Sequence, residues 1–389
     1  MSDAEWTVAP GFGAVADAFR ENLARRGERG AAFAAVRNGE VVVDVWGGAA
    51  APGVPWRADT LQLLFSGTKG LVAACFARLL DHGLVDLDAP VARYWPEFAA
   101  NGKAGITVGE VLSHRAGLPG VRRRLRERDL CDGARMARLL AAQPREWDPR
   151  AGAVYHPLTY GWLAGELIRR VTGRSAGRYL ADEIAAPLGL DIWLGLPERH
   201  AGRVSELAYG PGWGTAAQLS VRAGESDRLL GAAWANPPLF PAPRMPWNDP
   251  DFRAAEIPGA NAIGTARSLA RLYGCLALGG RLDGVTVASA EALAGATAER
   301  SHFVDPLTGE RLRYGAGFQL QTGGRRLGPP AHAFGHTGAG GSVSAAWPRE
   351  RIGVAYVMNE LRDEPGPDPR AVALLRAVHR AAAGQRSTA

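Results

Sequence analysis

The sequence predicts an α+β fold: an antiparallel sheet flanked by N- and C-terminal helices, with an all-helical subdomain inserted between its two halves. Two strand-like runs, residues 31–36 and 41–46, are joined by an Asn-Gly pair at 38–39, which is typical of tight hairpin turns. Near the other end of the chain, residues 342–347 and 352–358 flank a second turn. The intervening sequence has the apolar spacing of helices, so we expect the two ends to build one sheet.

The helices around and inside this sheet are predicted from apolar spacing and from glycine stops. Residues 12–23 place large apolar side chains at helical intervals, and residues 371–383 form a closing helix at the other end. Within the insertion, residues 68–82 and 159–171 are each followed by a glycine in the position of a helix C-cap. We expect the terminal helices to flank the sheet and the other two to belong to the insertion.

We expect one domain, residues 1–389, made of two subdomains. The α/β subdomain combines residues 1–60 and 255–389, and the helical subdomain covers residues 61–254. Residues 234–258 interleave prolines with large apolar side chains, which predicts a long irregular segment. Its aromatic content argues against disorder and for a functional role.

The composition is that of an ordinary globular protein with an unusual shortage of lysine. Of 389 residues, 47% are hydrophobic and 22% charged, which is enough for a sizeable core. The formal net charge is +6, and nearly all of the basic residues are arginines, since Lys69 and Lys103 are the two lysines. The arginine-rich stretch at 122–128 lacks interleaved aromatic residues, so we interpret it as a solvated helix face and expect no nucleic-acid partner.

Cysteine usage and hydropathy predict a cytoplasmic protein. Cys75, Cys131 and Cys275 are odd in number, far apart and without metal-ligand spacing, which favours a reducing compartment over a disulfide framework. The N-terminus lacks the basic and apolar regions of a signal peptide, and no run of about eighteen apolar residues occurs. The chain has no glycine-rich phosphate loop, and we expect neither metal nor cofactor.

A serine and a lysine three residues apart form the main chemical candidate. Ser66 starts the helix predicted over 68–82, and Lys69 lies one turn later on the same face. A helix N-terminus favours a developing negative charge, and a buried lysine can lose its proton near neutral pH and then take the proton of the serine. Arginine cannot lose its proton at neutral pH. In a chain that uses arginine almost everywhere, a retained lysine can therefore mark a position that needs a proton acceptor. The competing interpretation is a serine N-cap followed by a solvent-exposed lysine; Lys103, in a polar stretch, carries no functional meaning.

Two further motifs follow along the chain. Tyr155-His156-Pro157 precedes the helix predicted over 159–171, and His336-Thr337-Gly338-Ala339-Gly340-Gly341 leads into the strand predicted over 342–347. In order and spacing, the three motifs resemble the serine β-lactamase and penicillin-binding protein superfamily, and most closely the class C β-lactamase-like carboxylesterases (family VIII-type esterases). The resemblance covers roughly residues 10–380, and its supporting matches are residues 112–119, 187–190 and 263–266.

The resemblance implies a β-lactamase/transpeptidase-like fold and distinct roles for these residues. Ser66 would be acylated, Lys69 would hold and shuttle its proton, and Tyr155, as phenolate or hydrogen-bonded phenol, would act as general base and then as acid to the leaving group. The backbone N–H groups of Ser66 and Ala339 would form the oxyanion hole. Residues implied or expected to bind substrate are His156, His336, Thr337, Gly338 and Gly340, together with Trp234 and Trp247 from the irregular segment.

Two positions depart from the β-lactamases. The asparagine usually found two residues after the tyrosine is replaced by Pro157, which offers only a backbone carbonyl. The lysine that usually starts the third motif is replaced by His336, which can be neutral at pH 7. Both changes argue against β-lactam or D-alanyl peptide substrates and for neutral esters or acyl groups. It stays open whether His336 is only structural, and whether His156 is structural or supports the site from behind.

We therefore expect a serine hydrolase that forms an acyl-enzyme at Ser66, most simply a carboxylesterase acting on small neutral esters. The alternative is an acyltransferase or peptide cyclase of specialised metabolism, because the aromatic segment that includes Trp234 and Trp247 can shield an acyl-enzyme from water. A weak β-lactamase, a cell-wall peptidase and a catalytically silent binding protein are the remaining interpretations. The sequence predicts no oligomeric state.

Overall fold

Helices and strands follow one another along most of the chain. The computed structural model describes residues 5–148, 152–211, 213, 228–364 and 366–384. The helices are α1 (Gly13–Arg25), α2 (Gly67–Asp81), α3 (Val108–Leu112), α4 (Gly133–Ala142), α5 (Thr159–Thr172), α6 (Ala176–Leu180), α8 (Arg228–Trp234), α9 (Pro250–Ala254), α10 (Ala266–Ala277), α11 (Ala290–Thr297) and α12 (Pro369–Gly384). The strands are β1 (Thr7–Val8), β2 (Gly30–Arg37), β3 (Glu40–Ala51), β4 (Val54–Pro55), β5 (Gln62–Leu63), β6 (Ile192–Trp193), β7 (Ala208–Tyr209), β8 (Ile263–Gly264), β9 (Arg281–Leu282), β10 (Val285–Thr286), β11 (Ser301–Val304), β12 (Arg311–Tyr314), β13 (Gln319–Leu320), β14 (Phe334–Thr337), β15 (Val343–Trp347), β16 (Ile352–Met358) and β17 (Glu360–Leu361).

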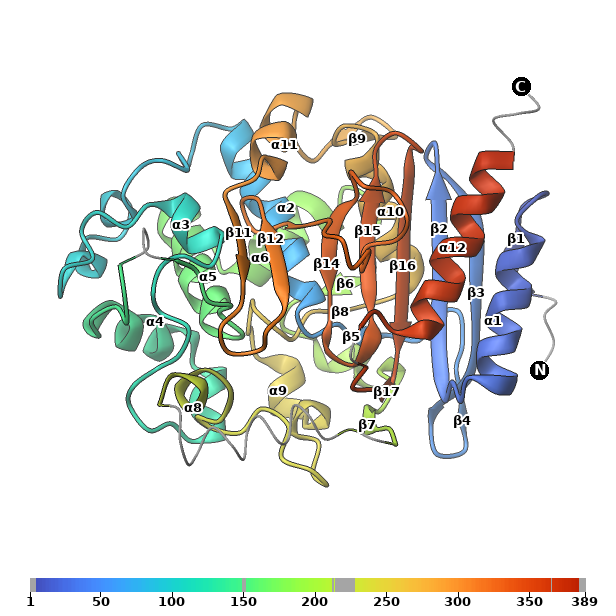
Figure 1. Cartoon of the computed structure of the whole chain (residues 1–389), viewed down its shortest axis with the longest axis horizontal. Helices are drawn as coiled ribbons and strands as arrows, with labels where there is room; N and C mark the ends of the chain where they lie inside the picture. Colours follow the sequence, from blue (N-terminus) through green and yellow to red (C-terminus); the bar gives the residue numbers. More distant parts are fainter. Residues whose placement is uncertain (1–4, 149–151, 212, 214–227, 365, 385–389) are drawn as a thin grey trace.

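A large antiparallel sheet joins the two ends of the chain (Figure 1). Its strands run in the order β1-β3-β2-β16-β15-β14-β13-β12-β11, and β4 pairs with β3. Where the two ends meet, β2 pairs with β16 from Ala31 opposite Met358 to Arg37 opposite Ile352. The turn between β2 and β3 has positive φ at both Asn38 and Gly39, as a tight hairpin requires. The predicted fold class is confirmed: one antiparallel sheet uses strands from both ends.

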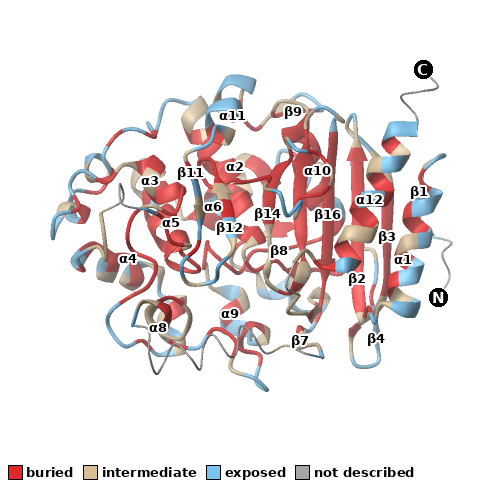
Figure 2. Ribbon diagram, in the orientation of Figure 1, coloured by how far each residue is buried: buried red, intermediate tan, exposed pale blue. Residues whose placement is uncertain are grey.

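Helices cover both faces of this sheet. On one face α1 and α12 pack together, and Asn22 of α1 donates to the carbonyl oxygen of Arg370 in α12. On the other face lies α10, which approaches β16 so closely that a Cβ on Gly353 would stand 2.0 Å from the backbone nitrogen of Gly274. Figure 2 shows the strands between these two layers as almost entirely buried. This explains why residues 352–358 are nearly continuously apolar rather than alternating.

The middle of the chain forms the helical half of the molecule, on the left in Figure 1. The predicted helices at α2 and α5 are confirmed, and the glycines after them, Gly83 and Gly173, have φ values of +64° and +70°, as helix stops commonly do. The division into subdomains, with limits at residues 61 and 254, stays a prediction. No helix in the described part of the chain is long and apolar enough to span a bilayer.

The proline-rich segment differs in part from its prediction. Residues 235–245 have no regular helix or strand, but residues 246–248 form a 3-10 turn and α9 follows directly. The expectation of an irregular segment over 234–258 is therefore wrong for its second half, where Pro246 and Pro250 occupy first-turn positions that favour helix starts. Phe240 and Trp247 of this segment are buried, so it belongs to the core.

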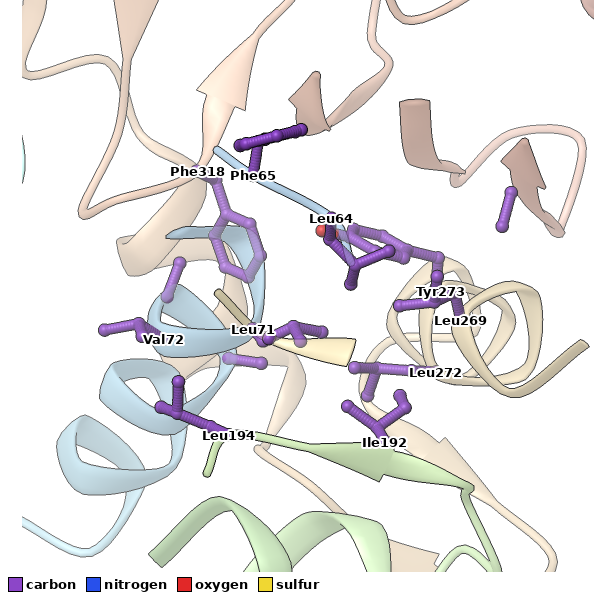
Figure 3. Packing of buried hydrophobic residues seen from close by; sticks show 14 of the residues in the cluster. Leu64, Phe65, Leu71, Val72, Ile192, Leu194, Leu269, Leu272, Tyr273 and Phe318 are labelled. Atoms are coloured by element: carbon purple, nitrogen blue, oxygen red, sulfur yellow. The ribbon is translucent and has the colours of Figure 1, made fainter. Parts of the chain in front are cut away.

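Helix α2 runs through the middle of the core, and most of its residues are buried. Figure 3 shows Leu71 and Val72 of α2 on one side, and Leu269 and Leu272 of α10 on the other, with Ile192 of β6 below them. Such close packing on several sides fixes the helix in position. Ser66, the candidate nucleophile, lies at the N-terminus of this helix.

Candidate active site

Ser66 stands at the start of α2, directly after a residue with an unusual backbone conformation. Phe65 has a φ of +46°, in the left-handed region that bulky residues normally avoid. Its ring packs against Phe240 and Trp247, with centroids 5.4 and 5.5 Å away, and this packing holds the turn. The Ser66 side chain makes no capping bond to the helix. Ser66 therefore occupies the N-cap position of α2 without capping the helix through its side chain, and its hydroxyl contacts the side chains of Lys69 and Tyr155 instead.

Lys69 is fully buried beside that hydroxyl. Its Nζ lies 3.2 Å from Ser66 Oγ, 2.8 Å from the carbonyl oxygen of Pro157 and 2.7 Å from that of Gly259. Burial holds the pKa of Lys69 well below its usual range. When the amine is neutral it has two N–H groups and one lone pair, so with both N–H groups on the two carbonyls its lone pair can accept the proton of the serine hydroxyl.

Tyr155 completes the contacts of the serine from the other side. Its hydroxyl lies 2.8 Å from Ser66 Oγ, and its backbone N–H donates to Asp305 over 2.8 Å. Burial raises the pKa of Tyr155, so at neutral pH the residue is a phenol rather than a phenolate. Of the two forms that the resemblance allowed, the structure therefore favours the hydrogen-bonded phenol.

The turn after β14 lies against the backbone that leads to Ser66. A Cβ on Gly338 would stand 2.3 Å from the carbonyl oxygen of Leu64, so this close approach requires glycine. Ala339 starts a 3-10 turn, η9 (Ala339–Gly341), and Ser66 precedes the first residue of α2. Backbone N–H groups at the start of a helical turn have no acceptor within it. The N–H of Ser66 thus stands at the start of α2, and that of Ala339 stands in the adjoining turn, whose middle residue, Gly340, has a non-helical φ of +83°.

The two predicted substrate-binding histidines are buried. His156 is fully buried, and its ring nitrogens contact the N–H of Leu118 and the carbonyl oxygen of Val154. His156 does not line the cleft. Its position fits the alternative that it is structural or supports the site from behind. His336 is 2% exposed, and its Nδ1 lies 2.7 Å from the carbonyl oxygen of Thr337. Burial lowers the pKa of His336 to about 3, so it is neutral at pH 7.

A cleft of about 250 Å³ opens beside the Thr337–Gly341 turn. Its walls include Trp213, Trp234 and Phe240 on the aromatic side and the start of α12 on the other. Trp234 also stacks on Tyr155, with ring centroids 6.4 Å apart, so the cleft adjoins the hydroxyl that contacts Ser66. Ser66 is not part of the cleft lining, so the cleft lies beside the serine rather than over it.

Trp247 differs from its expected role. It is 2% exposed, and its indole N–H donates to the carbonyl oxygen of Leu239. The structure therefore places Trp247 behind Phe65 and away from the cleft, whereas Trp234, which was predicted with it, lines the cleft. The aromatic segment thus supplies one residue for the cleft wall and one for the support of the Ser66 turn.

Several residues that hold the site were not predicted from the sequence. Gly259 supplies the second carbonyl to Lys69, and Asp305 holds the backbone of Tyr155. Gln319 accepts hydrogen bonds from both the backbone N–H and the hydroxyl of Thr337. Trp213 joins the cleft wall. A backbone carbonyl carries no signal of side-chain type, and single Asp and Gln residues are too common to be singled out.

The cysteines take no part in this arrangement. Cys75, Cys131 and Cys275 are free. Burial raises the pKa of Cys75 and Cys275 to about 12, so these two are unreactive thiols at neutral pH. Among the described residues, no group of three or more His, Cys, Asp or Glu side chains could hold a metal ion.

Comparisons with known proteins place this geometry in context. Residues 15–378 match the Beta-lactamase family. The chain is 38% identical to the esterase/beta-lactamase LipL of Mycobacterium tuberculosis, over 90% of this chain and 82% of LipL. It superimposes on the crystal structure of a family VIII carboxylesterase with a TM-score of 0.88 and 40% identity, over 96% of this chain and 98% of that one. A shorter match, 30% identical over 37% of this chain and 40% of the other, is to monacolin J acid methylbutanoyltransferase of Aspergillus terreus.

Proposed function

Because this chain belongs to the beta-lactamase family, we propose that Ser66, Lys69 and Tyr155 hydrolyse esters through an acyl-enzyme at the serine. The chain is a serine hydrolase of the esterase type. The observation that carries the residue assignment is the set of contacts around Lys69. Two backbone carbonyls accept the N–H groups of a neutral amine and direct its lone pair to Ser66 Oγ.

Acylation follows from these contacts. Ser66 Oγ attacks the ester carbonyl carbon while its proton passes to Lys69 Nζ. The N–H groups of Ser66 and Ala339 stabilise the oxyanion of the tetrahedral intermediate. When the intermediate collapses, the Tyr155 hydroxyl gives a proton to the departing alkoxide and takes up in its place the proton held by Lys69.

Deacylation repeats these steps with water as the nucleophile. Water attacks the acyl carbon, and its proton passes through the Tyr155 hydroxyl to neutral Lys69. Collapse of the second tetrahedral intermediate releases the acid, and Ser66 Oγ takes its proton back from the Lys69 ammonium. The cycle leaves the enzyme unchanged and consumes one ester and one water.

The charges around the cleft support neutral esters as substrates. The residue before the Thr337–Gly341 turn is His336, which is buried and neutral and so offers no positive charge to a substrate carboxylate. Two arginines line the cleft, but Arg326 pairs with Glu310 over 2.7 Å and Arg362 pairs with Glu360 over 3.0 Å. A substrate anion would have to break one of these pairs, whereas a neutral ester breaks neither.

We also propose a cytoplasmic enzyme without a nucleic-acid partner. Three free cysteines, two of them in the core, suit a reducing compartment. In the arginine-rich stretch at 122–128, Arg122 pairs with Glu146 over 2.8 Å, so this guanidinium is neutralised within the protein rather than offered to phosphates.

The decisive experiment is hydrolysis of p-nitrophenyl acetate and butyrate by the wild type and by Ser66→Ala. We expect a burst of nitrophenol equal to the enzyme concentration, then turnover, and for Ser66→Ala a loss of at least about 10³-fold, since the nucleophile is gone. Thermal unfolding of both proteins checks that the variant is folded. Equal activity in the two proteins, or a wild type with neither burst nor turnover, would contradict the proposal.

Acyl transfer is the second candidate function. Trp213, Trp234 and Phe240 form an aromatic wall beside the serine, and such a wall disfavours water more than an organic alcohol or amine. The partial match to a methylbutanoyltransferase fits this alternative. The test is product analysis with p-nitrophenyl butyrate and a series of added alcohols and amines. Butyrate as the sole product at every acceptor concentration would rule out transfer.

A further inference from the structure

A cluster of buried charges lies behind the turn that carries Ala339. Arg370, in the first turn of α12, is fully buried, and its guanidinium donates to Glu28 over 2.9 Å and to Asp368 over 2.7 Å. The hydroxyl of Tyr356 donates to the second carboxylate oxygen of Glu28. Glu28 lies between α1 and β2, Tyr356 on β16 and Asp368 just before α12. The cluster therefore joins the outer helices to the sheet.

The same guanidinium also reaches the turn. Its Nη2 donates to the carbonyl oxygens of Gly340 and Glu360, each over 3.2 Å, and the backbone N–H of Arg362 donates to the Gly340 carbonyl over 3.2 Å. Gly340 has a φ of +83° and Gly341 of +122°, conformations that glycine adopts readily but does not hold by itself. The Gly340 carbonyl, with two donors, is the point at which this turn is fixed.

Burial of an arginine in this place needs a reason. Isolated buried ion pairs are costly to desolvate, and apolar residues of similar volume often replace them without loss of stability. A guanidinium differs from an apolar side chain because its planar fork can serve two carboxylates and backbone carbonyls at once. Here it does so, and one of those carbonyls belongs to the residue next to Ala339.

We propose that Arg370 is a positioning residue of the oxyanion hole. Glu28 and Asp368 hold its guanidinium, which in turn keeps the Gly340 carbonyl directed into the interior. With that carbonyl fixed, the turn cannot rotate, and the N–H of Ala339 stays directed at the substrate carbonyl. The inference rests on the proposed ester hydrolysis at Ser66.

The test replaces the guanidinium and measures how much the oxyanion hole still accelerates ester hydrolysis. For Arg370→Met with p-nitrophenyl butyrate, we expect kcat to fall about 10-fold or more while KM changes little, because a displaced donor weakens transition-state stabilisation above all. A sharper readout is the ratio of kcat/KM for this ester to kcat/KM for its thiono analogue. Sulfur accepts hydrogen bonds poorly and gains little from the hole, so we expect the ratio to fall about 10-fold too.

Arg78→Met is the matched control. Arg78 is a half-buried arginine that pairs with Glu183 and donates to the carbonyl oxygen of Thr286, near the far end of α2 from Ser66. Loss of this guanidinium should lower the thermal midpoint and leave the oxygen-to-sulfur ratio unchanged. Asp368→Asn is a milder second variant, which removes one charge of the cluster without shortening a side chain. We expect it to lower the ratio in the same direction, so the test does not depend on Arg370→Met folding.

The outcomes separate this inference from the proposed function. If the variants at 370 and 368 fold and keep both kcat and the oxygen-to-sulfur ratio of the wild type, the positioning role is wrong while ester hydrolysis stands. If the wild type itself shows no turnover that depends on Ser66, the proposed function fails first. A ratio that falls in Arg370→Met and stays constant in Arg78→Met supports the role.

Discussion

Both lysines of the chain are fully buried, and their partners differ by one group. Lys69 contacts two backbone carbonyls and the hydroxyl of Ser66. Lys103 donates to three carbonyls, those of Ala100, Ala141 and Gln143, two of which end α4. Lys103 therefore has a structural role that its polar sequence context did not indicate, since it ties a loop to the C-terminal end of a helix. Three carbonyls can satisfy an ammonium, whereas two carbonyls and a serine suit an amine that accepts a proton.

This difference predicts opposite effects of the same substitution. We expect Lys69→Met to lower kcat for p-nitrophenyl butyrate by at least about 10³-fold, because the serine loses its proton acceptor. Lys103→Met should keep kcat but lower the free energy of unfolding by about 3 kcal/mol, because three buried carbonyls lose their donor. Steady-state kinetics and urea unfolding of both variants check this. Comparable losses of kcat in the two variants would contradict a catalytic role particular to Lys69.

The side chains of the candidate site could be predicted from the sequence, but most of what holds them could not. Ser66, Lys69 and Tyr155 belong to short motifs whose residue types carry the chemistry, and the structure brings them into contact. The support comes from Gly259 and Asp305, which lie 190 and 150 residues away from the groups they bind. Contacts of this kind are set by the packed fold and leave no local pattern.

At the scale of elements, two tryptophans of the aromatic segment at residues 234–258 have different structural roles. Trp234 ends α8, stacks on Tyr155 and lines the cleft. Trp247, in the 3-10 turn before α9, is buried and packs against Phe65, whose strained backbone precedes the nucleophile. One tryptophan therefore lines the cleft, and the other packs behind the turn that carries the serine.

Alanine substitutions separate these two roles. Trp234→Ala should lower kcat/KM by about 10-fold for butyrate and longer esters, because the aromatic wall loses one of its three residues and Tyr155 loses its stacking contact with Trp234. Trp247→Ala should lower the free energy of unfolding by about 3 to 5 kcal/mol, because it leaves a large cavity in the core. Kinetics across an acyl-length series and urea unfolding measure both effects. A Trp234→Ala protein with wild-type kcat/KM throughout the series would show that the wall does not contact substrate.

The elements that were predicted are those with strong local signals. The β2–β3 hairpin has an Asn-Gly turn, and α2 and α5 have long apolar faces with glycine stops. Strands β11, β12 and β13 were not predicted, although they complete the sheet at its β14 side. They are two to four residues long, and β11 is largely exposed or half-buried, so its sequence has little of the apolar alternation that identifies a strand.

At the scale of the whole molecule, pairing of the two chain ends creates features that neither end contains. Arg370 and Glu28 are separated by 342 residues and form a fully buried ion pair behind the Ala339 turn. In the sequence each is an ordinary charged residue, because the residue type alone does not show whether a charge is buried or exposed. The neutral state of the buried histidines likewise depends on the complete fold, because it results from burial.

These histidines contribute to the change of stability with pH. Burial lowers the pKa of His156 to about 4 and that of His336 to about 3, and it lowers the pKa of His114 as well. In the unfolded chain their pKa values lie near 6.5. Between pH 6.5 and about 4 these histidines bind more protons in the unfolded state, so their contribution lowers the free energy of unfolding as the pH falls. Four buried carboxyls act in the opposite direction, because burial raises the pKa of Glu28, Asp44, Asp305 and Glu310. The contribution of the histidines is therefore measured as a difference between variants.

Each buried histidine should contribute about 1.4 kcal/mol per pH unit to this slope. The measurement is urea unfolding of the wild type, His156→Gln and His302→Gln at pH 5, 5.5 and 6. We expect the slope of His156→Gln to be smaller than that of the wild type by about 1.4 kcal/mol per pH unit, whatever its stability at pH 7. His302 is exposed on β11, so His302→Gln controls for the substitution itself. Equal slopes for His156→Gln and the wild type would mean that His156 is protonated in the folded protein, and would contradict the neutral state that its burial predicts.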